Sequence, residues 1–476
     1  MKKILSSIVA LLLLFSLTAC SLPIPSLDLD FDLDLPFLKT ETDSEEQSDS
    51  STEQETYADE ESDLECESES ESEVQTEASI EPISLEAIEQ IVGNKAESFA
   101  VGEDRYDIDC KAYRLNNAAI EDYRRIIAEL KNEYMQQYTD NGADGIDGSC
   151  YQTTLCDAAY TVNVTFYSRT GELYLTVEEY RPLSVYQIAP PTTVRGTNTS
   201  FHMPEMPTVN GEYKFGECEI FRLSNGKFVI VDGAQEFSAE PTVEYLEGLT
   251  PDGEIPVVEA WFLTHAHPDH AYCIWGIGRD SDLVSRIRVE GFYYTLPDDE
   301  GMKKEPDYDD LMIQLSNINE ALGNFRNTRG EVTAQYKLHG GMRFYFGELE
   351  VQVLFTQDQI RPEEYGNKLN DTSTSFKFIV HTEGKENTTF LIMGDASSAI
   401  CKKLMKMYTS DTLHTTYFQS LHHGNNDCLE FFMYIKPDYL NYTHRSDEKG
   451  KSKTGYKYLA FTCKKVYYSP TVIEIN

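Results

Sequence analysis

The sequence predicts an α/β protein, because strand-like and helix-like segments alternate along its C-terminal half from Gly211 to Asn476. This half opens with a hairpin, Glu219–Leu223 and Phe228–Gly233, joined at the turn residues Asn225-Gly226. Several of the apolar strands that follow end in His or Asp, which are residues able to bind a metal. The fold and its chemistry are therefore expected to meet at the ends of the strands.

The clearest of these strand ends is Trp261-Phe262-Leu263-Thr264 followed by His265-Ala266-His267-Pro268-Asp269-His270. Side chains alternate along an extended chain, so His265 and His267 project from the same side and can share one ion. Asp269 and His270 follow Pro268, where the chain must turn, and can face a second ion. Imidazole and carboxylate together suit zinc, with manganese or iron as alternatives. Three of the chain's ten histidines fall within these residues, which argues against a polar turn with incidental histidines.

Two later strands end in the same way. The strand Phe390–Met393 stops at Gly394-Asp395, and the alternative for Asp395 is a cap on the predicted helix Ser397–Met407. The strand Tyr417–Leu421 ends in His422-His423-Gly424. One of these two histidines is expected to bind a metal and the other to contact substrate. The sequence does not order them, and His422 is preferred as the ligand because it leaves the strand first.

Together the His-x-His-x-Asp-His segment, the Gly-Asp strand end and the His-His-Gly strand end resemble the metallo-β-lactamase-fold hydrolases. The His-His-Gly signature resembles one branch in particular, which contains competence-type DNA-uptake hydrolases and cell-surface phosphorylcholine esterases. The resemblance covers residues 211–476 and implies a four-layer αββα sandwich that binds two divalent cations, with zinc preferred and manganese possible. It implies the ligands His265, His267, Asp269, His270, Asp395 and His422. Asp269 and His423 are the expected catalytic residues, and Asp232 is expected to orient a ligand imidazole.

The chain departs from the broader family before Asp395. Many members carry a further His ligand there, where this chain has Asn370-Asp371-Thr372-Ser373. The resembled branch shares this feature. The first metal is left with Asp371, Asn370 or water as its third ligand.

The resemblance implies a metal-dependent hydrolase, and a phosphodiester is the preferred bond because paired cations can hold the attacking and departing oxygens. The expected substrate is a small molecule or a cell-wall polymer. The alternatives are a competence-type surface nuclease and a non-catalytic tethered binding protein. A formal charge of −41 without a basic stripe argues against nucleic acid as a partner.

The N-terminus predicts export. Lys2 and Lys3 precede a short apolar run, and Leu17-Thr18-Ala19-Cys20 resembles a bacterial lipobox, so residues 1–19 are expected to be a signal peptide. A lipid on Cys20 would anchor the protein to the outer face of the cytoplasmic membrane, facing the cell exterior. Residues 20–80, rich in Asp, Glu, Ser and Thr, are expected to form a disordered tether.

Between the tether and the hydrolase region, residues 84–182 predict a small α+β accessory domain. The spacing of apolar residues predicts a helix over Ile120–Tyr138, and alternation predicts strands over 160–166 and 173–177. Cys150 and Cys156 are either a disulfide or free thiols. The Pro- and Thr-rich stretch 189–209 is expected to be a linker.

Overall fold

The computed structural model describes residues 90, 96–99, 110–133, 137–156, 160–179, 199–209, 212–213, 216–296, 308–357, 369–425, 428–443 and 463–475. The expected signal peptide, Cys20 and the acidic tether lie outside these residues. In the described part of the chain, none of the helices is both long and apolar enough to span a bilayer.

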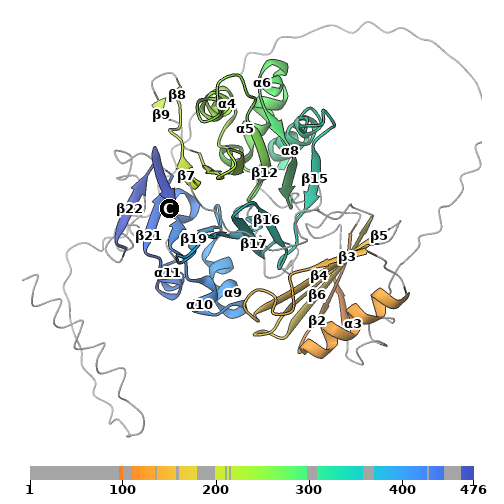
Figure 1. Cartoon of the computed structure of the whole chain (residues 1–476). Helices are drawn as coiled ribbons and strands as arrows, with labels where there is room; N and C mark the ends of the chain where they lie inside the picture. Colours follow the sequence, from red (N-terminus) through yellow and green to blue (C-terminus); the bar gives the residue numbers. More distant parts are fainter. Residues whose placement is uncertain are drawn as a thin grey trace, which may run out of the picture. The chain divides into compact units, whose positions relative to one another are not determined.

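The accessory region is a six-stranded sheet covered by one helix (Figure 1). Its strands follow the order β1-β2-β6-β5-β4-β3, and every neighbouring pair is antiparallel. The helix packs Tyr123, Ile126 and Leu130 onto the sheet, as the apolar spacing predicts. The elements are β1 (Ala96–Phe99), β2 (Cys110–Leu115), α3 (Ile120–Glu133), β3 (Gln137–Asp140), β4 (Cys150–Cys156), β5 (Tyr160–Tyr167) and β6 (Glu172–Glu179). The expected helix is too long at its C-terminus, because Gln137 already pairs with Cys156 in the sheet.

Cys150 and Cys156 are buried, and no disulfide joins them. They stand at the two ends of β4, where Cys150 pairs with Tyr167 and Cys156 pairs with Thr161. A strand rises about 3.3 Å per residue, so their Cα atoms are much farther apart than the roughly 6 Å that a disulfide spans. Of the two alternatives, the structure supports free thiols.

The C-terminal region contains two larger sheets. The first has the strand order β15-β14-β12-β11-β10-β7-β23, with β13 beside β12. Strands β11, β12, β14 and β15 run parallel to one another, whereas β10, β7 and β23 pair in antiparallel fashion. The bounds are β7 (Thr199–Met203), β10 (Cys218–Arg222), β11 (Phe228–Asp232), β12 (Val257–Phe262), β13 (Arg288–Val289), β14 (Gly291–Tyr294), β15 (Ala334–Lys337) and β23 (Thr471–Ile475).

The second sheet repeats this plan with the order β16-β17-β18-β19-β20-β21-β22. Neighbouring strands are antiparallel from β16 to β19 and parallel from β19 to β22. The bounds are β16 (Arg343–Phe346), β17 (Leu349–Phe355), β18 (Ser375–Val380), β19 (Thr388–Ile392), β20 (Tyr417–Gln419), β21 (Tyr439–Tyr442) and β22 (Lys465–Tyr468). A separate two-stranded ribbon joins β8 (Thr208–Val209) to β9 (Glu212–Tyr213).

Three buried apolar clusters show how the layers stack. The middle cluster lies between the sheets, where Phe221 of the first sheet stacks on Phe378 of the second with ring centroids 4.9 Å apart. The outer cluster of the first sheet includes helix residues such as Val243 and Ile274, and that of the second sheet includes Leu404. The helices are α4 (Ala239–Gly248), α5 (Pro268–Gly278), α6 (Ser281–Ser285) and α8 (Tyr308–Leu322) on the first side, and α9 (Ser398–Met407), α10 (Ser410–Leu413) and α11 (Leu429–Ile435) on the second. The expected α/β fold, a four-layer αββα sandwich, is confirmed (Figure 1).

The expected linker over 189–209 is wrong at its C-terminal end. Thr199–Met203 forms β7, a fully buried strand between β10 and β23, so the sandwich begins before Gly211. The Pro and Thr content of the surrounding stretch hides this strand. Its partner β23 is supplied by the far C-terminus, which local patterning does not reveal.

The accessory sheet and the second half of the sandwich share one core. Cys150 and Tyr167 belong to the same buried cluster as Leu354 and Tyr408. The rings of Tyr167 and Tyr408 meet edge-on, with centroids 5.9 Å apart. The Thr165 hydroxyl also donates to the Gly340 carbonyl at 2.9 Å. The accessory sheet is therefore packed onto the sandwich rather than joined to it only by a connecting segment.

Candidate metal centre

Most of the sequence-predicted site residues lie at or just beyond the carboxyl ends of parallel strands. In the first sheet, β11 ends at Asp232 and β12 leads into His265, while in the second sheet β19 leads into Asp395 and β20 into His423. Open parallel sheets commonly place their ligand sites at this edge. Because both sheets present the same edge, their ligands converge from two sides.

The first donor set comes from the segment between β12 and α5, together with Asp395. Helix α5 begins at Pro268, whose fixed φ suits a first helical position, and His267 is its N-cap residue in extended conformation. His265 Nε2 lies 2.9 Å from His267 Nδ1 and 3.9 Å from Asp395 Oδ2. These three residues offer ligand atoms within 4.8 Å of one another, which is the spacing of a metal site.

The second donor set surrounds the other oxygen of Asp395. His270 Nε2 lies 3.1 Å from His423 Nε2 and 3.2 Å from Asp395 Oδ1. His423 Nε2 also lies 3.2 Å from Asp269 Oδ2, on the first turn of α5. The structure thus gathers Glu217, His270, His423 and Asp395, whose ligand atoms all lie within 4.8 Å of one another, and Asp269 joins them through its contact with His423.

Asp395 stands between the two donor sets. It is almost fully buried, and no hydrogen bond satisfies its Oδ1 among the described residues. It does not cap the following helix, because Ser397 occupies the N-cap of α9 and its hydroxyl accepts a bond from the Ala399 N–H at 3.2 Å. A buried carboxylate oxygen facing imidazole nitrogens suits a bridging metal ligand.

The sequence favours His422 as the metal ligand, whereas the structure encloses His423 more deeply than His422. His423 is 2% exposed and lies within the second donor set, whereas His422 is 37% exposed, with Nε2 3.5 Å from Asp395 Oδ2. Both residues have left-handed backbone angles, with φ near 50°. This conformation is uncommon for a residue with a side chain, and it turns the second histidine inward rather than the first. Gly424 follows with φ 82°, and a Cβ there would lie 2.3 Å from the Tyr442 ring.

Asp232 fixes the tautomers of the first-sheet ligands. Its Oδ1 accepts the Thr264 N–H at 2.8 Å, and its Oδ2 lies 2.7 Å from both the Thr264 hydroxyl and His270 Nδ1. His270 therefore carries its proton on Nδ1 and leaves Nε2 free for a metal. The Thr264 hydroxyl, 3.1 Å from His265 Nδ1, sets His265 the same way.

His423 is held by residues that sequence reasoning did not identify as part of the site. Its Nδ1 lies 3.3 Å from Thr443 Oγ1 and 3.8 Å from Glu217 Oε2. Gln419 Nε2 donates to the same Glu217 oxygen at 2.8 Å. The signal in the sequence was present but weak: Glu217 and Glu219 occur two residues apart at the start of an otherwise apolar strand, and both are fully buried.

The electrostatics of the centre favour cation binding. Burial lowers the pKa of His265 and that of His267, so both imidazoles are neutral and able to bind a metal. Burial raises the pKa of Asp395, but the charges of His270 and His423 outweigh it and hold this pKa well below its ordinary value. Burial alone would lower the pKa of His270. The negative charges of Asp395 and Asp232 outweigh burial and raise this pKa well above its ordinary value. A bound cation would replace the positive charge that His270 otherwise carries.

Asn370 and Asp371 are the two side chains that the sequence offers as the third ligand of the first metal. Asn370 lies in a short 3₁₀ turn, Leu369–Thr372, and its Nδ2 is 3.5 Å from His422 Nδ1. Asp371 is buried beside it. Among the described residues, Asp371 belongs to neither donor set. The third donor that the structure brings to His265 and His267 is Asp395.

Comparison with known proteins adds only structural likenesses. No family model matches the sequence, and no curated protein matches it. Zn(2+)-bound PqqB from Methylobacterium extorquens is similar at 8% identity and TM-score 0.33, covering 56% of this chain and 89% of its own. The metallo-β-lactamase MIM-1 from Novosphingobium pentaromativorans is similar at 13% identity and TM-score 0.26, covering 56% of this chain and 81% of its own. A Cronobacter sakazakii metallo-β-lactamase with a HARLDQ motif follows at 14% identity and TM-score 0.25, covering 50% and 81%. The fold assignment itself comes from the sheet order and layering described above.

Proposed function

We propose that this protein is a metal-dependent hydrolase that cleaves phosphodiesters. One observation carries the proposal: Asp395 places its two oxygens between two separate His-rich donor sets, and one of these oxygens is buried without a hydrogen bond. His265, His267 and Asp395 would hold one divalent cation, and Asp269, His270, His423 and Asp395 would hold a second. Zinc is the preferred ion because imidazole and carboxylate ligands suit it, and manganese is the alternative.

Bound divalent cations supply Lewis acidity and lower the pKa of water toward neutrality. The protein contributes orientation and proton transfer. Asp232 and Thr264 hold the ring positions of His270 and His265, as Thr443 and Glu217 do for His423.

His422 is the histidine placed for proton transfer, in the role that the sequence-based interpretation gave to His423. It is partly exposed and its Nε2 lies 3.5 Å from Asp395 Oδ2, where it could take up the proton that an attacking water releases. A substrate bound over the centre would meet this ring rather than the enclosed His423. His422 is therefore assigned to protonate the departing oxygen of the substrate.

The choice of a phosphodiester rests on the His-His-Gly strand end and its resemblance to phosphodiester-cleaving relatives. We further propose, from residues 1–20 alone, that a lipid on Cys20 anchors the protein outside the cell. Envelope polymers or extracellular phosphodiesters would then be the substrates within reach.

The test is turnover of bis-(p-nitrophenyl) phosphate by the full chain, purified in detergent and loaded with zinc. Wild type is expected to release p-nitrophenol, and the double variant His265→Ala/Asp395→Ala is expected to lose this activity. The matched control is Asp411→Ala/His414→Ala, which removes the same residue types from an exposed surface. Wild-type turnover that survives complete chelation of metal would overturn the proposal.

A further inference from the structure

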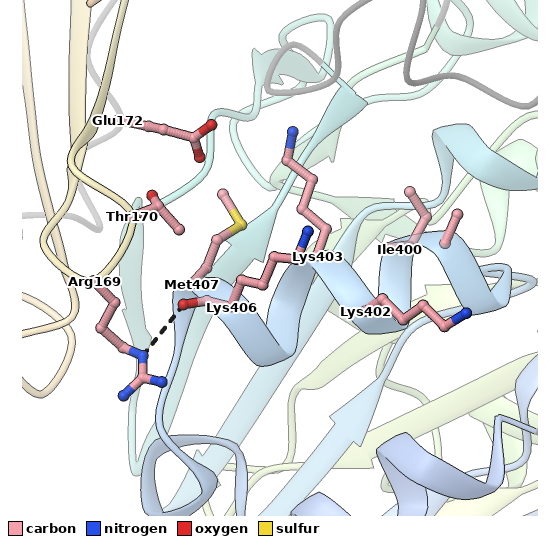
Figure 2. A pocket seen from close by; sticks show the side chains of 9 residues that line it. Arg169, Thr170, Glu172, Ile400, Lys402, Lys403, Lys406 and Met407 are labelled. Carbon is pink, nitrogen blue, oxygen red and sulfur yellow. Dashed lines mark hydrogen bonds between the residues drawn. The ribbon is translucent and has the colours of Figure 1, made fainter. Parts of the chain in front are cut away.

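A groove of about 690 Å³ lies between the accessory sheet and helix α9, away from the donor sets. One wall is the turn that joins β5 to β6, with Arg169, Thr170 and Glu172. The other wall is α9, as Figure 2 shows. The residues contributed by α9 are Ala399, Ile400, Lys402, Lys403, Lys406 and Met407.

This groove is cationic in a strongly acidic protein. Lys402, Lys403 and Lys406 line the groove from α9, with Lys406 one helical turn from each of the other two, and Arg169 lines it from the opposite wall. Helix α9 contains no acidic residue. The carboxylate in the lining, Glu172, is paired with the Arg114 guanidinium. A net positive potential therefore remains, although the chain carries −41 overall.

The helix dipole explains only part of this concentration of basic residues. Lysine near the C-terminus of a helix is favoured by the helix dipole, and that accounts for Lys406. The helix dipole does not account for Arg169, which belongs to the accessory sheet and precedes Lys406 by more than two hundred residues in the sequence. The Arg169 Nε donates to the Lys406 carbonyl at 3.2 Å, so the turn is fixed to the end of α9.

The walls of the groove are held in place by the shared core. Tyr167, two residues before Arg169, contacts Tyr408, which follows α9 directly. Thr170 also lines the groove, and its hydroxyl oxygen is buried without a hydrogen-bond partner among the described residues. Basic side chains and a free hydroxyl are suited to anionic oxygens, and lysine binds phosphate as a point charge.

Helix α9 runs from the metal centre to the groove. The helix begins three residues after Asp395 and ends next to Arg169. Ten residues of helix span about 15 Å. An extended chain lying across the metals can thus continue along the lysines of α9.

We propose that this groove binds phosphate groups of a polyanionic phosphodiester polymer, beyond the bond that is cleaved. The link to cleavage depends on the proposed function, whereas binding in the groove does not. A polymer without bases is favoured over a single-stranded nucleic acid, because the described residues that line the groove include no aromatic side chain on which a base could stack. The accessory sheet then has a role, since its Arg169 turn completes the polymer site.

The test measures binding and cleavage separately. Binding of a fluorescently labelled ten-unit glycerol-phosphate oligomer to the full chain is followed by anisotropy after metal has been chelated. The variant Lys402→Gln/Lys406→Gln is expected to bind about tenfold more weakly, with a smaller salt dependence. Both lysines are exposed, and Arg169→Gln provides a second variant at the opposite wall. The matched control, Lys131→Gln/Lys385→Gln, removes the same charge elsewhere and is expected to bind like wild type.

Cleavage assays on the zinc-loaded protein distinguish an effect of the groove on polymer binding from an effect on the cleavage step. The Lys402→Gln/Lys406→Gln variant is expected to raise KM for the oligomer about tenfold and to leave turnover of bis-(p-nitrophenyl) phosphate unchanged. A wild type that binds the oligomer but cleaves no phosphodiester would refute the proposed function and leave the groove intact.

Three results would overturn the proposal that the groove binds phosphate groups of the polymer. The first is equal oligomer binding by the groove variant and by the surface control. The second is equally tight competition by poly-L-glutamate of the same charge, which would remove the preference for phosphate. The third is equally tight competition by single-stranded oligothymidylate, which would return the surface to the nuclease alternative.

Discussion

Gly394 lies directly against Thr264, so closely that a Cβ on Gly394 would stand 2.6 Å from the Thr264 hydroxyl oxygen. Gly394 ends the β19 segment of the second sheet, and Thr264 follows β12 of the first. The contact therefore brings the two halves of the sandwich together immediately behind the candidate metal ligands His265 and Asp395. It also explains why glycine stands before Asp395, since this residue has φ +50° as well.

The first prediction is that Gly394→Ala lowers both stability and metal affinity. The added methyl must displace Thr264, and overpacking of this kind costs about 1–3 kcal/mol. Gly384→Ala is the matched control, because Gly384 also has positive φ but its Cβ would meet nothing within 4 Å. Urea unfolding of both variants measures the difference. Equal losses of stability would show that the contact with Thr264 does not matter.

The second prediction concerns Asp232→Asn. The amide can accept only through one atom, so its NH₂ group would face either the Thr264 backbone N–H or, in the orientation that keeps that backbone bond, both the Thr264 hydroxyl and His270 Nδ1. His270 would then carry its proton on Nε2 and lose its free ligand atom. Zinc affinity is expected to fall about 10- to 100-fold in chelator competition. The exposed Asp252→Asn should bind zinc as wild type does, and unchanged affinity in Asp232→Asn would refute the tautomer argument.

The third prediction separates the paired histidines. His423→Gln is expected to lose metal, because His423 is enclosed among Asp269, His270 and Asp395. His422→Gln should keep its metal content and lose about 10²- to 10⁴-fold in kcat, which is the usual contribution of a general acid. Metal analysis beside steady-state kinetics distinguishes the two. Loss of metal in His422→Gln with retention in His423→Gln would restore the order preferred from the sequence.

The fourth prediction is an acid sensitivity that arises away from the metal centre. Burial lowers the pKa of His202 to about 4, and Arg222 acts in the same direction. Its ring lies 2.7 Å from the Ser200 hydroxyl and 2.8 Å from that of Tyr245. Because the folded pKa lies below the unfolded value, this contribution to stability is complete above pH 6.5 and is lost as the pH falls toward 4. Each pKa unit corresponds to about 1.4 kcal/mol.

Denaturant unfolding at pH 7.5 and pH 5 measures this effect. The His202→Gln variant should lose less stability between these pH values than wild type, whereas the exposed His414→Gln should behave as wild type does. Both variants retain the other titrating groups, so those contributions cancel in the comparison. An identical pH dependence in His202→Gln and wild type would show that His202 does not titrate in this way.

The strand ends were predictable because local chemistry determines them. Apolar runs that stop at His265, Asp395 and His422-His423 mark the carboxyl ends of strands, and the parallel arrangement gathers these ends at one edge. The αββα layering followed from the resemblance and is confirmed by the sheet order.

The remaining features depend on long-range contacts or on backbone conformation. The order of His422 and His423 is set by two consecutive left-handed residues, which no propensity for histidine indicates. Glu217 reaches His423 through the β10 end, and β7 is recognisable only through its partner β23. The groove described above joins Arg169 to α9 across two regions that the sequence predicts to be separate domains.

The most direct test of the account is the metal content of the purified full chain after exposure to zinc and gel filtration, measured by plasma mass spectrometry. We expect two zinc ions per wild-type chain and a large loss of both in Asp395→Ala, because Asp395 contributes an oxygen to each donor set. The exposed Asp411→Ala should retain both ions. A wild-type chain that binds no zinc or manganese, or an Asp395→Ala variant that retains two ions, would contradict the central claim.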